Sequence, residues 1–403
     1  MRRQAVAVAL VGLFLAMGAV GLPNATGKND DRASWLLLVY LDADNNLDVY
    51  AGAQHVSIVE DDFDELMSVG STDSVVCYVL VDRWTSYSNL FRVDPGEMVE
   101  MTDFALNGEE ANMGDPATLR SFVSFATEET PAEHVLLVFW DHGSPNIVAY
   151  DDNGPEEGVP DSLTHHEVIE ALEGFHVDVI AADECNVAQM EVAYEYRMCG
   201  LQTDYLVAAE TYTGWRGYPY DQVFERLVDE PAMTAREAAV MMIDETQELL
   251  GKPPYMGEQV NEHGAIDLSK VDELANSLIR LSDLLKLNIN SCFNAVSKAR
   301  GNAVYLYGAN AIDLIDLKDF VIGVSKFSRS TEIKAACEDV LAAFDDAVVA
   351  LQLTQATAGK VNGLGIAFPH HPWEVTSYYE TYLFPGLGWL EFLEAYWAAA
   401  GAT

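Results

Sequence analysis

Two apolar segments of strand length, each followed at once by polar side chains, constrain the fold of this chain most strongly. The run 134–140 ends in Asp-His-Gly, and the run 176–182 ends in Asp-Glu-Cys. In an open parallel sheet, the carboxyl ends of the strands and the first turns of the following helices form the ligand crevice. We therefore expect His142 and Cys185 to lie on the same rim of a sheet.

The pattern of the whole chain predicts an α/β fold, with a mostly parallel central sheet and helices on both faces. Apolar runs also occur at 34–41, 74–82 and 205–210, and segments with helical periodicity separate them. Residues 88–101 suggest a hairpin, and 151–160 a turn-rich acidic loop. We expect an α/β core over residues 28–230. Residues 231–403 are expected to be largely helical with late strands, either completing the same domain or forming another unit.

The charge balance excludes some classes of partner. The chain has 22 basic and 64 acidic residues, a formal net charge of −42, and half of its residues are hydrophobic. Such a surface repels nucleic acids and anionic membranes and attracts cations and basic polypeptides. Solubility in a salty environment explains the acidity equally well at this stage.

The amino terminus has the pattern of an export signal. Arg2 and Arg3 precede an apolar run over 5–22, and small residues suited to cleavage follow by residue 27. We expect residues 1–27 to be a signal peptide, with an uncleaved N-terminal anchor as the alternative. The protein is then secreted or at the cell surface, and it contacts a membrane only if this segment is retained.

Cys185 is the candidate nucleophile among five cysteines that show no metal-binding spacing. His142 precedes it by 43 residues, and caspases have their histidine and cysteine in this order at a similar spacing. The alternative is an ordinary buried cysteine. The stretch Asp42–Asp48 suggests a calcium loop, but Leu47 and Ala53 stand where an EF-hand requires Gly and Glu. A capped strand-to-helix turn is the better interpretation, so the sequence predicts no metal ligands.

Four motifs together carry a resemblance to a known family. They are Trp35 to Leu47, Trp140-Asp-His-Gly, Asp183-Glu-Cys and the loop that begins at Ala209-Glu-Thr. Over residues 34–225 the chain resembles the clostripain family of cysteine peptidases, whose core is similar to that of caspases, gingipains and legumains. The resemblance implies a caspase-like α/β sandwich with a Cys-His pair, and it makes calcium a candidate cofactor although no motif requires one.

The resemblance also implies roles for individual residues. Cys185 would attack a peptide carbonyl, His142 would protonate the leaving amine, and the N–H groups of Gly143 and Cys185 would form the oxyanion hole. Asp183 matches the family aspartate that binds Arg or Lys before the cut bond. Glu210, judged only from its place at a strand end, would add a second negative charge to that pocket.

The expected function is therefore an exported cysteine endopeptidase that cuts polypeptides after Arg or Lys. Two alternatives remain: a catalytically silent, acidic peptide-binding or cell-surface protein, and another thiol acyl-transfer enzyme such as a transpeptidase. The sequence departs from the family at Glu184, where a small residue is usual, and at Ser144-Pro145, which replaces a glycine-rich continuation. Residues 143–184 also contain no Lys or Arg, so we expect no self-cleavage in this segment.

Overall fold

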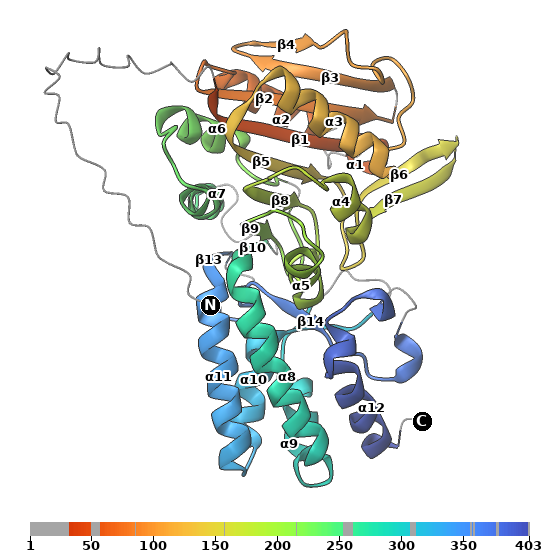
Figure 1. Ribbon diagram of the computed structural model, residues 1–403, viewed down its shortest axis with the longest axis vertical. Helices are drawn as coiled ribbons and strands as arrows, with labels where there is room; N and C mark the ends of the chain where they lie inside the picture. Colours follow the sequence, from red (N-terminus) through yellow and green to blue (C-terminus); the bar gives the residue numbers. More distant parts are fainter. Residues whose placement is uncertain are drawn as a thin grey trace, which may run out of the picture. The chain divides into compact units, whose positions relative to one another are not determined.

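A nine-stranded sheet organises the chain in the computed structural model, with the order β13-β10-β9-β8-β5-β1-β2-β3-β4 (Figure 1). Its five central strands are parallel: β1 (Ala33–Ala43), β2 (Val75–Arg83), β5 (Ala132–Trp140), β8 (Val179–Asp183) and β9 (Tyr205–Ala208). Antiparallel strands extend both edges: β3 (Ser86–Asp94), β4 (Glu97–Glu100), β10 (Glu262–Asp267) and β13 (Val348–Leu353). The predicted mostly parallel sheet is confirmed, as is the hairpin at 88–101.

The structure describes residues 32–49, 57–84, 86–156, 158–214, 216–252, 261–306, 312–354, 357, 359–375 and 379–401. The expected signal peptide or anchor at 1–27 lies outside these residues. Residues Arg32–Thr403 form one compact unit. No helix in the described part is both long and apolar enough to cross a membrane.

Helices cover both faces of the sheet, which explains why its central strands are continuously apolar. Along β1, Leu36, Leu38 and Tyr40 pack into one core, whereas the alternate residues Leu37 and Val39 pack into the other. The first core also takes residues from α3 (Pro116–Glu129), α4 (His165–Ala171) and α5 (Met190–Met198). The second takes residues from α2 (Ile58–Val69), α6 (Tyr220–Asp229) and α7 (Ala235–Leu250).

The chain beyond residue 250 is largely helical, as the sequence predicts. Its helices are α8 (Val271–Leu287), α9 (Ile289–Asn302), α10 (Leu317–Phe327), α11 (Thr331–Ala347) and α12 (Trp389–Ala400). A small antiparallel sheet joins β11 (Tyr305–Leu306), β12 (Leu314–Asp316) and β14 (Gly365–Ala367). Apolar residues of these elements belong to the same core as α3–α5. Two strands of the large sheet, β10 and β13, also come from beyond residue 230.

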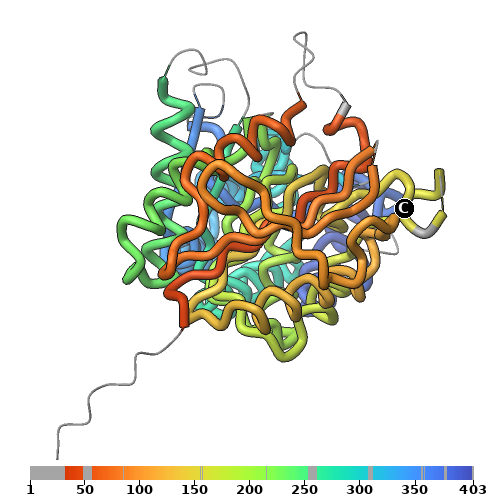
Figure 2. Tube along the Cα trace, turned by 90° about the horizontal axis from the view of Figure 1, so that it is seen from above, coloured from red at the N-terminus to blue at the C-terminus, as the bar shows by residue number. Residues whose placement is uncertain are grey.

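The acidic segment at 151–160 is not the open loop expected from its composition. It forms most of an antiparallel hairpin of β6 (Ile147–Glu156) and β7 (Val159–Thr164), which projects from the strands beside it in both views (Figures 1 and 2). The N–H of Asp152 donates to the carbonyl of Asp44, and the Asn153 amide donates to the Asp44 carboxylate. Contacts with a distant turn therefore stabilise this hairpin, and local composition does not reveal them.

Candidate active site

A cavity of about 390 Å³ opens where β5 and β8 end and the next segments begin. Its lining includes three of the predicted site residues, namely His142, Asp183 and Cys185. The remaining lining residues are Leu47, Ile58, Trp140, Asp141, Glu184, Tyr212, Thr213, Gly214 and Gly217. Parallel pairing of β5 with β8, in which Trp140 lies opposite Asp183, brings the two polar clusters to one rim.

The His142 ring is oriented by a residue that the sequence did not suggest. Its Nε2 lies 2.9 Å from Oδ1 of Asn46, the first residue of α1 (Asn46–Val49). An amide oxygen only accepts, so this contact assigns the proton to Nε2 and leaves Nδ1 as an acceptor. Burial lowers the pKa of His142 below its ordinary 6.5, and the imidazole is therefore neutral at neutral pH.

The Cys185 thiol is half-buried and protonated at neutral pH. Its Sγ lies 3.9 Å from the carbonyl oxygen of Thr213. Burial, with a smaller contribution from the nearby acidic residues Glu184 and Asp183, raises its pKa to about 11. A thiol in this environment reacts as a nucleophile only when a base removes its proton.

Gly143 packs against the segment that carries the thiol. A Cβ added to Gly143 would lie 2.7 Å from Cβ of Glu184 and 2.9 Å from the carbonyl oxygen of Cys185. Only glycine permits so close an approach of the two backbones. In the described part of the chain, the N–H groups of Gly143 and Cys185 donate no hydrogen bond to protein. Cys185 lines the cavity, and Gly143 lies between the lining residue His142 and Ser144 without lining the cavity itself.

Asp183 ends β8 with its carboxylate at the cavity wall and 7% of its surface exposed. Its Oδ2 accepts hydrogen bonds from the Tyr218 N–H at 3.0 Å and from the Tyr220 hydroxyl at 3.1 Å. Burial raises its pKa to about 6, against the lowering effect of these two donors. The carboxylate is consequently ionised at neutral pH and offers a fixed negative charge.

Glu210 does not reach this cavity, contrary to the sequence-based expectation. Its side chain is fully buried, and Oε1 accepts hydrogen bonds from the N–H groups of Asn362 and Gly363, each at 2.8 Å. Its own N–H donates to the Glu262 carboxylate. Glu210 does follow a strand end, as predicted, but its side chain turns toward the C-terminal region, whose backbone amides donate to its Oε1.

Glu184, the unusual residue before the cysteine, is buried beneath the His-Gly segment. Its Oε1 accepts from the Ala149 N–H at 3.1 Å, and its side chain contacts Gly143. Burial raises the pKa of Glu184 well above 4.5 and so favours the protonated carboxyl. In its charged form Glu184 raises the pKa of the Cys185 thiol, and burial weakens this opposition by favouring the protonated carboxyl.

The loop between β9 and α6 forms one wall of the cavity. It contributes Tyr212, Thr213 and Gly217, and Trp215 lies outside the described residues. Arg216 in this loop forms an ion pair with Glu65 of α2. Glu65 also accepts a hydrogen bond from the N–H of Tyr220. These contacts attach the loop to the helix on the other side of the cavity.

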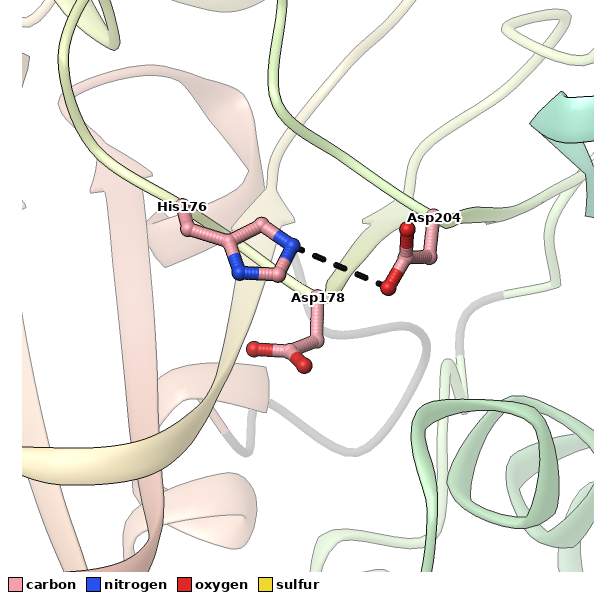
Figure 3. Close-up of side chains that lie close together, drawn as sticks. All are labelled: His176, Asp178 and Asp204. Atoms are coloured by element: carbon pink, nitrogen blue, oxygen red, sulfur yellow. Dashed lines mark ion pairs between the residues drawn. The ribbon is translucent and has the colours of Figure 1, made fainter. Parts of the chain in front are cut away.

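Two groups of side chains in the described part of the chain have a spacing compatible with a metal ion. In the first, Figure 3 shows His176 joined by an ion pair to Asp204, with the Asp178 carboxylate near them but without an ion pair to either. The Asp178 oxygens already accept hydrogen bonds from His134 at 2.6 Å and from the Val135 N–H at 2.9 Å. This first group is therefore explained by contacts within the protein.

The second group contains Asp44, Asp82 and Glu110, and one oxygen from each lies within 4.8 Å of the other two. Asp82 is fully buried, and its Oδ2 has no hydrogen-bond partner in the described part of the chain. Calcium takes only oxygen ligands, mostly carboxylates and carbonyls. These residues thus fit the calcium ion that the family resemblance implies.

Comparison with known proteins agrees with this geometry. The model of the clostripain family, peptidase family C11, matches residues 39–395. Clostripain of Hathewaya histolytica is 27% identical over 321 residues, which cover 67% of this chain and 59% of that protein. The chain thus spans less than two thirds of that relative's length.

Two solved structures share the fold. A secreted C11 cysteine protease of Bacteroides thetaiotaomicron, solved with an irreversible peptide inhibitor, aligns with a TM-score of 0.64 and 17% identity, over 91% of this chain and 99% of its own. An inactive zymogen C11 protease of Parabacteroides distasonis gives a TM-score of 0.64 and 17% identity, over 89% and 98%. The caspase-like α/β fold is thereby confirmed. From the match of the family model over most of its length, this chain belongs to the clostripain family.

Proposed function

We propose that this protein is a secreted or cell-surface cysteine endopeptidase that hydrolyses peptide bonds after Arg or Lys. The observation that carries the proposal is the presence of a thiol, an imidazole and a buried carboxylate, those of Cys185, His142 and Asp183, around one cavity. Membership of the clostripain family supports the peptidase activity. The secreted location rests on the pattern of residues 1–27 and on the description of the similar Bacteroides protein as secreted.

The chemistry follows from the protonation states of the two groups. His142 is neutral with Nδ1 free to accept, so it takes the proton of the Cys185 thiol as Sγ attacks the substrate carbonyl carbon. The N–H groups of Gly143 and Cys185 stabilise the oxyanion, and each such donor contributes about 2.7–4 kcal/mol to lowering the barrier. The protonated His142 then gives its proton to the leaving amine, and water hydrolyses the resulting thioester.

Asp183 supplies the specificity for a basic side chain. A cationic group entering the cavity meets a carboxylate that Tyr218 and Tyr220 hold in place. The two donors fix the carboxylate before the substrate arrives, so binding costs little reorganisation. A planar guanidinium can contact a carboxylate through two N–H groups, which favours Arg over Lys.

Peptide substrates that end in Arg, Lys or Asp before a fluorogenic leaving group test the proposal. We expect turnover of the Arg and Lys substrates, no turnover of the Asp substrate, and loss of all activity in Cys185→Ala. Asp183→Asn should lower kcat/KM for the Arg substrate by roughly 30-fold or more, since the loss of one partner of a buried charge pair costs about 2–5 kcal/mol.

Two outcomes would contradict the proposal. Turnover that survives in Cys185→Ala would exclude the thiol mechanism. A failure of wild type both to turn over any of the peptides and to react at Cys185 with an electrophile carrying a basic side chain would favour the silent peptide-binding alternative.

A further inference from the structure

We propose, building on the function proposed above, that Trp140 contacts the basic side chain that Asp183 binds and that Asp62 holds the Trp140 ring for this role. Trp140 is then a second specificity residue of the cavity, and Asp62 is its positioning residue. Glu210 was the residue expected to assist Asp183, but its side chain is held by backbone amides of the C-terminal region. The residues beside Asp183 are different ones.

Trp140 and Asp183 leave the sheet side by side and on the same face. They are partners in the parallel register of β5 with β8, and neighbouring strands lie about 4.8 Å apart. Trp140 packs into the core that α2, α6 and α7 cover, and so do Val179 and Ala181, which precede Asp183 at alternate positions of β8. Alternate residues of a strand share a face. Because Trp140 and Asp183 also both line the cavity, a cation paired with Asp183 lies next to the indole ring.

A buried carboxyl group fixes the orientation of the Trp140 ring. The indole Nε1 donates to Oδ2 of Asp62 at 2.7 Å, and Asp62 is 3% exposed. Nε1 carries the only hydrogen-bond donor of the ring, so the rest of the ring is what remains to border the cavity. Asp62 follows Ile58 by four residues in α2, which places both on one face of that helix. Ile58 lines the cavity, and the same face of α2 thus provides a cavity wall and the support of the ring.

The electrostatic environment of the ring suits a cation. Burial, together with repulsion from Asp183 and Glu65, raises the pKa of Asp62 well above 3.8, so the carboxyl groups of Asp62 and Asp183 are close enough to interact. Arg216 acts in the opposite direction, but it forms its ion pair with Glu65. Among the described residues, the cavity lining contains no Lys or Arg. A basic side chain that enters therefore relieves repulsion and meets no positive charge.

An indole ring supplies attraction that a carboxylate alone does not. A guanidinium or ammonium within about 6 Å of an aromatic ring face is attracted by the ring quadrupole, most strongly by Trp and more when the site excludes water. Leu47 and Ile58 are half-buried in the same lining, and the alkyl stem of Arg or Lys packs well on such apolar surface. The cavity thus selects a long apolar stem that ends in a cation. A planar guanidinium stacks better than an ammonium, which adds to the preference for Arg.

Steady-state kinetics with the Arg peptide and labelling of Cys185 by iodoacetamide together test the role of Trp140. Iodoacetamide is small and neutral, so its reaction reports the thiol and imidazole without the basic pocket. In Trp140→Leu we expect KM to rise about 10-fold, with kcat changed less than about threefold and the labelling rate unchanged. Trp140→Phe keeps an aromatic face and should raise KM less. Trp84→Leu makes the same substitution at an exposed residue outside the cavity lining and should keep the KM of wild type.

A pair of variants at Asp62 tests its positioning role. Asp62→Asn keeps an oxygen that accepts from the indole Nε1, so its KM should stay within about threefold of wild type. Asp62→Leu removes the acceptor and should raise KM as Trp140→Leu does. This pair decides the matter even if Trp140→Leu does not fold, because a purely structural role of Asp62 would not act on KM alone.

The outcomes separate this role from the proposed function. A wild type that turns over no Arg peptide would overturn both. In an active wild type, three results would overturn the role of Trp140 and Asp62 alone: an unchanged KM in Trp140→Leu, a parallel loss of kcat and of Cys185 labelling in that variant, or equal KM values in Asp62→Asn and Asp62→Leu.

Discussion

At the scale of single residues, the environment of each acidic or basic group decides what it does. Glu184 and Asp183 are adjacent and carry the same functional group, but burial beneath Gly143 raises the pKa of Glu184 well above 4.5, whereas the pKa of Asp183 at the cavity wall is raised to about 6. His142 is in turn defined by the amide oxygen of Asn46, which fixes its tautomer. A sequence gives the residue type, but only the surroundings give the protonation state.

Asn46 is a positioning residue for His142, and its replacement should affect kcat more than KM. We expect Asn46→Ala to lower kcat about 10–100-fold with KM changed less than about threefold, because the ring loses its orientation but the substrate pocket remains. Asn46→Asp keeps an acceptor and adds a negative charge. It should recover much of the activity and move the acidic limb of the pH–kcat/KM profile upward, because a carboxylate favours the imidazolium.

Steady-state kinetics over a range of pH distinguish these effects from simple destabilisation. If Asn46→Asp has the same activity and the same pH profile as Asn46→Ala, the contact with His142 does not have the positioning role described here.

At the scale of elements, the loop between β9 and α6 is shaped by its attachment to α2. Arg216 pairs with Glu65, and the wall residues Tyr212, Thr213 and Gly217 lie on either side of Arg216. A long-range ion pair that is only partly exposed therefore helps to hold the loop against α2.

Arg216→Ala should raise KM several-fold and leave kcat largely unchanged. Without the ion pair the loop samples more conformations, and substrate binding must then order it at a cost in free energy. Arg197→Ala removes a more exposed ion pair, with Asp272 of α8, and serves as the matched control with no expected change. Michaelis–Menten kinetics with the Arg substrate provide the measurement, and equal KM values for the two variants would refute this view of the loop.

The segment between β5 and β8 should remain uncut. Residues 143–184 hold the β6–β7 hairpin and α4, and they contain no Lys or Arg. A peptidase specific for basic residues has no site there. Purified wild type and Cys185→Ala, incubated in parallel and followed by intact-mass measurement, should show the same chain over this segment. A cut inside 143–184 in wild type alone would disprove the expectation.

At the scale of the whole molecule, the unusual feature is the number of acidic side chains kept inside. Burial raises the pKa of Asp82 and Glu262 to about 8 and that of Glu191 to about 7. All three are at least 98% buried. In the folded protein these groups hold protons that they release in the unfolded chain. Their contribution to stability is therefore present at low pH and is lost as pH rises through 7 to 8.

In calcium-free buffer, Tm should fall by roughly 5 °C between pH 6.5 and pH 8.5. The lower limit of this pH range avoids effects of the buried His165 and His263. Burial lowers their pKa values to about 4, so their contribution to the stability of the folded protein is lost as pH falls. Glu262→Gln, which carries no titrating proton, should reduce this slope. Differential scanning calorimetry measures Tm against pH for wild type and for the variant. A wild-type Tm that is constant or rises over this range would contradict the view that these buried carboxyl groups hold protons in the folded protein.

The sequence by itself determined the parallel α/β core, because strands buried on both faces are continuously apolar and the helices between them have a visible period. It also placed His142, Asp183 and Cys185 at strand ends, and parallel pairing leaves such residues on one rim. It failed for Glu210 and for the segment 151–160, and it did not indicate Asn46 or the grouping of Asp44, Asp82 and Glu110. Only the tertiary structure decided these. The direction of a side chain and the charge of a buried carboxyl depend on partners far away in the chain, and no local pattern records them.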